Sequence, residues 1–147
     1  MKLLVLNGPN INMIGIREPD IYGKRDYPAI VKKIEDYAAE RNIEIRILQS
    51  NHEGDLVDWI QEAYFEKYDG IVMNPGAYTH TSVAILDALK AIAPIPCVEV
   101  HLSDISQRES FRHISYPAMA CIAQIAGYGD DGYLMAIDTL VKHLSGN

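Results

Sequence analysis

The chain has 147 residues, of which 48% are hydrophobic and 22% charged, and its formal net charge is −7. The length fits a single domain over residues 1–147, and the composition is typical of a soluble globular fold. The acidic balance argues against binding to nucleic acid or to an anionic membrane, and no apolar run approaches the roughly 18 residues of a membrane span. We expect a cytoplasmic protein, since the first apolar run is too short for a signal peptide and both Cys97 and Cys121 lie in apolar runs, as reduced core cysteines do.

Five apolar runs predict the strands of the fold. The first, residues 3–6, is unbroken and is stopped by Gly8 and Pro9, which favours a strand buried on both faces. Residues 43–47 alternate strictly between apolar and polar, as expected of an edge strand with one face in water. The remaining strands are expected at 70–73, 97–100 and 120–126.

Four stretches outside these runs repeat apolar residues at helical spacing. The first helix is predicted to begin at the N-cap Asp26, with Pro28 in its first turn. The second should follow a polar loop that ends in the cap Asp55, and the third should begin among the hydroxyl side chains of residues 79–82. A last helix is expected after the glycine-containing turn of residues 127–132.

The alternation of strands and helices predicts an α/β fold with a parallel sheet and helices on both faces. The alternating run fits a sheet edge and the first run fits the middle, which gives the flavodoxin-like, doubly wound order 2-1-3-4-5. Ligands of such sheets bind beyond the carboxyl ends of the strands, where the strand order reverses. The sequence therefore predicts one crevice bounded by residues 7–22, 74–80 and 101–103.

His101 opens a loop in this predicted crevice and is a candidate acid or base, with a capped loop histidine as the alternative. Glu99 lies two residues earlier on the same strand, so both side chains point to one face and the carboxylate can orient the imidazole. Ser103 and Asp104 can start a helical turn, whose free N–H groups favour an anion. The sequence thus places one proton-transfer group beside one anion site.

Arg17 and Tyr22 lie on a long loop stiffened by prolines, which predicts a lid that brings the two side chains together. The reference pKa of tyrosine is about 10, so Tyr22 is a poor base at neutral pH unless a neighbouring guanidinium stabilises its phenolate. Tyr22 is otherwise a packing residue of the loop. Arg112 is either a surface arginine or a ligand, and Asp87, two helical turns after His80, is either a surface carboxylate or a ligand.

The sequence predicts no cofactor and no metal. The glycines of residues 127–132 match a dinucleotide-binding pattern formally, but only fifteen residues follow, too few for the strand and the acidic residue that the site requires. The imaginable metal ligands are His80, Glu99, His101 and His113. Their spacing fits neither a helical pair nor a zinc site.

Several multi-residue motifs follow one another in the chain. They are LNGPN at 6–10, REP at 17–19 with YG at 22–23, QSNHEG at 49–54, NPGAYTHTS at 74–82, EVHLS at 99–103 and FRH at 111–113. In type, order and spacing they resemble the type II 3-dehydroquinate dehydratases, over essentially the whole chain. The departures are residues 114–119, where a proline follows the tyrosine, and the isoleucines at positions 11 and 14.

The resemblance implies a hydro-lyase that needs no cofactor and converts 3-dehydroquinate to 3-dehydroshikimate by anti elimination through an enolate. The pathway is the shikimate pathway or, alternatively, quinate breakdown. The resemblance makes Tyr22 the base, Arg17 the group that stabilises its phenolate, and Asn10 a residue that holds the enolate through water. His101 becomes the acid that protonates the departing hydroxyl, with Glu99 beside it.

The same resemblance assigns the substrate ligands. The side chains implied to bind the ring hydroxyls are Asn74, His80, Asp87 and Arg112. The backbone N–H groups of Leu102 and Ser103 are implied to bind the substrate carboxylate. The resemblance also implies a homo-oligomer, a dodecamer built from trimers, in which Asp87 reaches the site of a neighbouring subunit.

Two other classes of protein share the predicted fold. A flavodoxin-like electron carrier needs a hydroxyl-rich phosphate loop after the first strand, where this chain has residues 8–11, Gly-Pro-Asn-Ile. A receiver-type signalling domain needs an aspartate at the end of the third strand and acidic residues at the end of the first. These places hold Asn74 and Asn7. The electron carrier and the receiver domain are therefore both weaker alternatives than the dehydratase.

Overall fold

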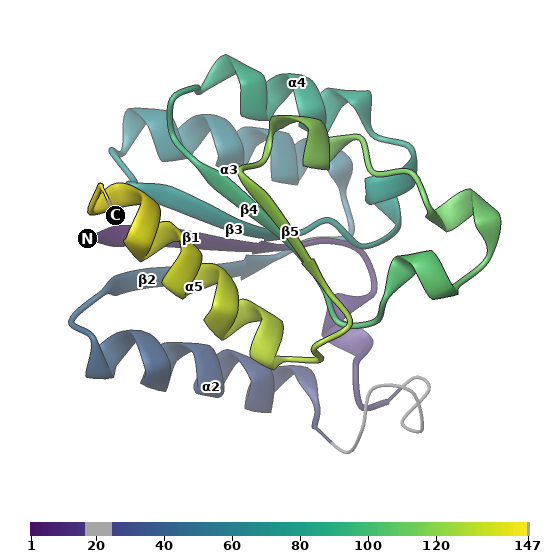
Figure 1. The fold of residues 1–147 in the computed structure, drawn as a ribbon, viewed down its shortest axis with the longest axis horizontal. Coiled ribbons are helices and arrows are strands. Elements are labelled where there is room, and N and C mark those ends of the chain that lie inside the picture. Colours follow the sequence, from purple (N-terminus) through teal and green to yellow (C-terminus); the bar gives the residue numbers. More distant parts are fainter. Residues whose placement is uncertain (17–24, 147) are drawn as a thin grey trace.

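The computed structural model describes residues 1–16 and 25–146 of the chain. These residues form a parallel sheet between two layers of helices (Figure 1). The sheet has five strands in the order β2-β1-β3-β4-β5, and every neighbouring pair is parallel. The predicted flavodoxin-like, doubly wound topology is confirmed.

The strands follow the predicted apolar runs closely. They are β1 Lys2–Asn7, β2 Glu44–Gln49, β3 Gly70–Asn74, β4 Cys97–His101 and β5 Ala123–Ala126. Strands β3 and β4 are buried along their whole length, whereas β2 lies at an edge and alternates in exposure over its first half, as its sequence pattern predicts. β5 begins three residues later than predicted, because Pro117–Ala120 forms a 3₁₀ turn, η5, in front of it.

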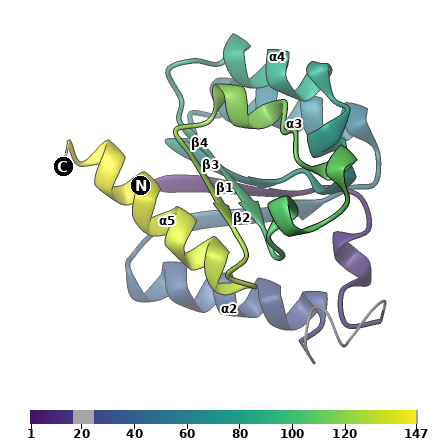
Figure 2. The same ribbon diagram turned by 45° about the vertical axis from the view of Figure 1, so that its right-hand side comes forward.

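Four α-helices among the described residues cover the sheet. They are α2 Tyr27–Glu40, α3 Glu53–Phe65, α4 Val83–Ala91 and α5 Asp131–Leu144. Figure 2 shows α2 and α5 on one face of the sheet and α3 and α4 on the other. The remaining short 3₁₀ turns are η1 Ile11–Met13, η2 Gly76–His80, η3 Ile105–Gln107 and η4 Ser110–Arg112. No helix of the described residues is long and apolar enough to span a membrane.

The helix starts confirm two of the predicted caps and correct a third. Asp26 accepts a hydrogen bond from the N–H of Ala29 at 3.0 Å, and Ser82 caps α4 in the same way. The prediction that Asp55 caps the second helix is wrong. α3 begins at Glu53, three residues earlier than predicted, with His52 at its N-cap position, and the Asp55 carboxylate instead accepts a hydrogen bond from the Ser50 hydroxyl at 2.6 Å.

The strict alternation of side chains along the central strands builds two hydrophobic cores. On β1, Leu3 and Val5 pack in the core beneath α2 and α5, whereas Leu4 and Leu6 pack in the core beneath α3 and α4. Both cores are continuous with the neighbouring strands. The central strands are therefore fixed from both faces, which holds the loops at their carboxyl ends in place.

Two of those loops pack directly on each other. β1 and β3 end side by side, with Asn7 opposite Asn74 in the register. A Cβ on Gly8 would lie 2.3 Å from the carbonyl oxygen of Pro75, so only glycine fits there. Gly76 has φ +60° and faces the carbonyl of Pro9 in the same way. The close approach of these two loops forms one wall of the site described below.

Candidate active site

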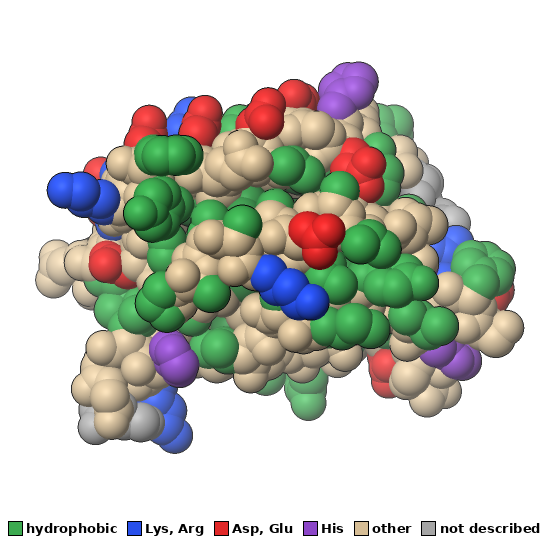
Figure 3. Space-filling view, turned by 90° about the horizontal axis from the view of Figure 1, so that it is seen from above, with side chains coloured by type: hydrophobic (Ala, Val, Ile, Leu, Met, Phe, Trp, Pro, Cys, Tyr) green, Lys and Arg blue, Asp and Glu red, His purple; other side chains and the backbone are tan. Residues whose placement is uncertain are grey.

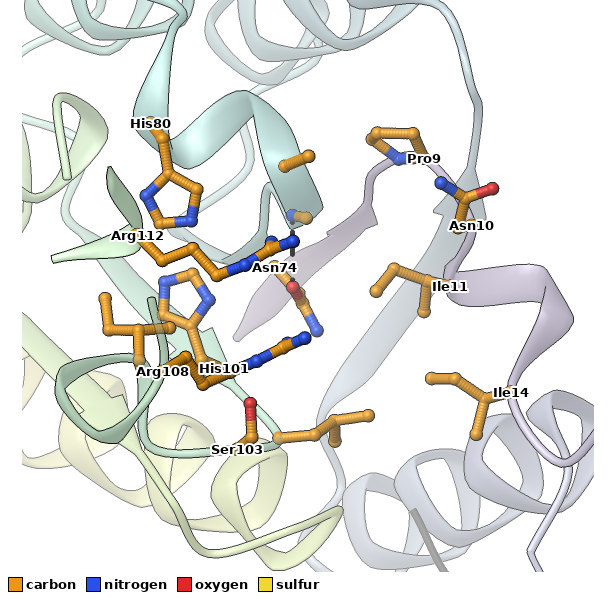
Figure 4. Close-up of a pocket in the computed structure, with 14 residues that line it drawn as sticks. Pro9, Asn10, Ile11, Ile14, Asn74, His80, His101, Ser103, Arg108 and Arg112 are labelled. Atoms are coloured by element: carbon orange, nitrogen blue, oxygen red, sulfur yellow. Dashed lines mark hydrogen bonds between the residues drawn. The ribbon is translucent and has the colours of Figure 1, made fainter. Parts of the chain in front are cut away.

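A pocket of about 170 Å³ opens at the carboxyl ends of β1, β3 and β4, at the point where the strand order reverses. Figure 4 shows imidazole and guanidinium groups on one side of it and the turn that follows β1 on the other. The predicted site residues that line it are Asn10, Asn74, His80, His101, Leu102, Ser103 and Arg112. Among the described residues, the structure thus brings most of the predicted site to one place.

Glu99 and His101 lie on the same face of β4, as predicted. Glu99 is completely buried, and its Oε2 lies 3.2 Å from Nε2 of His101. Its other partners are the hydroxyl of Ser115, which donates to Oε1 at 2.6 Å, and the side-chain amide of Gln124, which donates to Oε2. Nε2 of His101 makes no aligned hydrogen bond to any described residue, although the Glu99 carboxylate is this close.

The environment of Glu99 determines its charge. Burial alone would raise the pKa of the carboxyl, but His101, Ser115 and Gln124 together outweigh it and hold the pKa below the ordinary value. Glu99 is therefore ionised at neutral pH. It does not line the pocket itself but contacts His101, which does.

His80 and Arg112 lie on the same side of the pocket as His101 (Figure 4). Nδ1 of His80 lies 2.8 Å from the carbonyl oxygen of Ile114. A carbonyl can only accept, so Nδ1 carries a proton and a neutral His80 has Nε2 free as an acceptor. Arg112 donates from Nε to Glu109 at 2.6 Å, which leaves its terminal nitrogens for a ligand.

Arg108 is a pocket residue that the sequence analysis did not select. It lines the same pocket and lies four residues before Arg112, on the segment of η3 and η4. The available signal was the repeat of two arginines in a short polar segment that follows His101. Pocket-lining residues of the described chain include two histidines and two arginines but no carboxylate, so the site favours an anion although the chain is acidic.

Asn10 lies at the opposite wall of the pocket in the left-handed conformation, with φ 68°. Its backbone N–H donates to Oδ1 of Asn51 at 3.1 Å. The side chain of Gln49 donates to the carbonyl of Gly8, also at 3.1 Å, and to the same Asn51 oxygen. The motif at 49–54 therefore supports the motif at 6–10, a role that the sequence alone did not indicate.

Ile11, Ile14 and Ile105 give the pocket its apolar side. Two of them are the isoleucines that depart from the resembled family, so these substitutions lie in the pocket wall. Ile14 is three residues before Arg17. The predictions for Arg17 and Tyr22 lie outside the described residues.

Asp87 is exposed on α4 and does not line the pocket. Its predicted role at a neighbouring subunit's site stays a prediction. In the described part of the chain, no group of three His, Cys, Asp or Glu side chains is placed to hold a metal ion. Gly127 and Gly129 adopt positive φ in the turn before α5, as the turn prediction requires.

The fold and the site together define an α/β protein with a histidine–carboxylate pair in a basic pocket at the switch point of the sheet. The profile of the family described as Dehydroquinase class II matches residues 1–141. The 3-dehydroquinate dehydratase of Clostridium perfringens (strain SM101 / Type A) is 54% identical over 144 residues, which cover 98% of each chain. That of Lachnoclostridium phytofermentans is 55% identical over 142 residues, or 97% of each.

Solved structures agree with these relatives. The crystal structure of type II dehydroquinase from Butyrivibrio crossotus superposes with a TM-score of 0.94 at 55% identity, over 96% of this chain and 97% of that one. The type II dehydroquinase from Propionibacterium acnes gives a TM-score of 0.90 at 37% identity, over 96% of each chain. The chain belongs to the class II dehydroquinase family. The resemblance and the predicted enzyme class are confirmed, and the electron-carrier and receiver alternatives are excluded.

Proposed function

We propose that the protein dehydrates 3-dehydroquinate to 3-dehydroshikimate by anti elimination through an enolate, as a step of the shikimate pathway. The observation that carries the proposal is His101, backed by the buried carboxylate of Glu99 and facing a pocket rich in cationic groups. Such a pocket suits a substrate that carries a carboxylate, and a positioned imidazole suits the proton transfer that an elimination needs.

The first step removes a proton next to the ketone, and Tyr22 is the proposed base with Arg17 as the cation that stabilises its phenolate. Both assignments rest on the family motif. Asn10 lines the pocket and is proposed to hold the developing enolate oxygen through water. The hydroxyl then leaves on the opposite face, and His101 gives it a proton.

The remaining polar groups hold the substrate. The proposed ligands of the ring hydroxyls within the described subunit are Asn74, His80 and Arg112. The backbone N–H groups of Leu102 and Ser103 are proposed to bind the carboxylate, which is supported by the place of both residues in the pocket lining. Asp87 is proposed to complete the site of a second subunit.

Enone absorbance in the ultraviolet tests the proposed function. Purified protein is treated with a chelator, dialysed and mixed with 3-dehydroquinate, and the conjugated enone of the product is followed with time. We expect full turnover without added metal or nucleotide, since the tyrosine and the histidine supply both proton transfers. No enone, or activity that returns only with a divalent metal, would contradict the proposal.

A further inference from the structure

Tyr133 joins the ends of two central strands from beneath the pocket. It lies in the first turn of α5 and is completely buried. Its hydroxyl donates to Oδ1 of Asn7 at 2.5 Å and accepts from Nδ2 of Asn74 at 3.0 Å. Asn7 and Asn74 are opposite one another in the register of β1 and β3 and are themselves at most 2% exposed. Only Asn74 of the three lines the pocket.

The direction of these hydrogen bonds is set by a backbone group. The N–H of Gly76 lies 3.2 Å from Oδ1 of Asn74, and a backbone N–H can only donate. Asn74 therefore turns its oxygen toward Gly76 and its nitrogen toward Tyr133. The Tyr133 oxygen must accept this bond, which leaves its single proton for Asn7.

The chain of hydrogen bonds continues consistently beyond Asn7. Its Nδ2 donates to the hydroxyl of Tyr27 at 3.3 Å. Reversing the Asn74 amide would place two donors face to face at Gly76, so only one direction satisfies every member. Burial raises the pKa of Tyr133 far above its ordinary value, so the hydroxyl stays protonated and keeps its two bonds.

These hydrogen bonds determine which atoms of the Asn74 amide remain available to a ligand. Gly76 occupies its oxygen, and Tyr133 occupies one of the two hydrogens on its nitrogen. The second hydrogen stays available at the pocket. We propose that Tyr133 is a positioning residue that holds the Asn74 amide as a hydrogen-bond donor, so that Asn74 binds an acceptor oxygen of the substrate. This inference rests on the proposed function and adds a determinant of substrate binding to it.

The test removes one hydroxyl. Tyr133→Phe keeps the buried ring but leaves the Asn74 nitrogen without its acceptor, and the amide can then swing away from its donating position. We expect KM for 3-dehydroquinate to rise roughly tenfold, the size of one lost hydrogen bond, while kcat changes much less. Tyr37→Phe is the matched control. Tyr37 links α2 to α5 by donating to Asp138 at 2.7 Å but does not line the pocket, so KM and kcat should stay as in wild type.

A double-mutant cycle separates positioning from a merely structural role. If Tyr133 acts through Asn74, then Tyr133→Phe should leave KM unchanged once Asn74→Ala is present. If the two effects on KM multiply, or if Tyr133→Phe alone leaves KM as in wild type, the proposal is overturned.

The donor direction can be tested even if Tyr133→Phe does not fold. Asn74→Asp keeps the acceptor toward Gly76 but cannot donate from an ionised carboxylate, so it should bind substrate no better than Asn74→Ala. A wild-type KM for Asn74→Asp would refute the inference. A wild-type protein without turnover would instead refute the proposed function, so the two failures are distinguishable.

Discussion

Glu99 keeps its charge although it is fully buried, because three neighbours offset the loss of water. Ser115 and Gln124 donate to the two carboxylate oxygens, and His101 stands beside them as a partner of opposite charge when it is protonated. Gln124 lies directly opposite Glu99 in the register of β4 and β5. A carboxylate that is held by two donors keeps a fixed orientation, and the imidazole in contact with it is held in turn.

The charge of Glu99 predicts a pH dependence of stability. Its pKa is lower in the folded protein than in the unfolded chain, so the ionised form stabilises the fold above about pH 4.5, the range of an ordinary glutamate. The contribution is lost as the pH falls through the lowered folded pKa, at about 1.4 kcal/mol for each unit of difference. The free energy of unfolding, measured with urea at several pH values, should fall at acid pH in wild type and fall less in Glu99→Gln. If the free energy of unfolding depends on pH equally in the two proteins, the lowered pKa of Glu99 is contradicted.

Arg17 and Tyr22 form a second residue pair whose roles can be separated. Tyr22→Phe should leave substrate binding nearly intact and abolish most turnover, since only the hydroxyl is lost. Arg17→Ala should also be severe, but it should recover rate in alkaline buffer, where more of the phenol ionises. In a double-mutant cycle on kcat/KM the two losses should be far from additive, because both remove one phenolate. Independent effects without alkaline recovery would make Arg17 a substrate ligand instead.

At the scale of the elements, the sequence predicted every strand and helix that builds the sheet and its two covering layers. This succeeded because the central runs are unbroken and the helices repeat every three to four residues. The start of α3 was misplaced because Ser50 and Asp55 bond to each other across the turn, which no periodicity reveals. The start of β5 was placed too early because the turn η5 and the strand share one apolar stretch of sequence, so the pattern does not show where one ends and the other begins.

The site was predictable where a motif follows a strand and hidden where contacts are distant in sequence. Asn74 and His101 are the last residues of β3 and β4, and Ser103 lies two residues beyond His101, so the topology alone places them together. Tyr133 reaches Asn74 from 59 residues away, and only the packing of α5 on the sheet brings the two together. Arg108 gave a weak signal, because arginines in a polar segment are usually surface residues.

The contact between the loops after β1 and β3 predicts a pair of glycine variants with opposite effects. Gly8→Ala would place a methyl group 2.3 Å from the Pro75 oxygen and push the loops apart, at a cost of about 1–3 kcal/mol in unfolding free energy. Gly54→Ala, in the first turn of α3, meets no atom within 4 Å and should stabilise by about 1 kcal/mol or less. Urea denaturation measures both. A neutral Gly8→Ala would show that the loops can separate freely.

At the scale of the whole molecule, the face formed by α3 and α4 gathers hydrophobic side chains (Figure 3). Tyr64 and Phe65 at the end of α3 and Val83 on α4 are each more than half exposed, and Met119 of the adjacent η5 is 65% exposed. Asp87 is on the exposed side of α4. An apolar surface of this kind is typical of a contact with another protein chain, which agrees with the proposed oligomer.

The proposed dodecamer of trimers predicts that activity depends on assembly. Light scattering at low protein concentration should show a stable oligomer, and Asp87→Ala should raise KM because it alters the neighbouring subunit's site. Asp36→Ala, an exposed aspartate on α2 at the opposite face of the sheet, is the control and should behave as wild type. A fully active monomer would contradict the proposed role of Asp87.

The proposed role of His101 as the acid of the elimination is tested by measuring kcat of His101→Ala. We expect kcat to fall roughly 10²- to 10⁴-fold, the loss typical of a missing general acid, with a much smaller change in KM. His143→Ala, at the exposed end of α5, controls for the loss of a histidine and should keep the wild-type rate. An unchanged kcat for His101→Ala would contradict this role of His101 and assign the acid elsewhere, with His80 the next candidate.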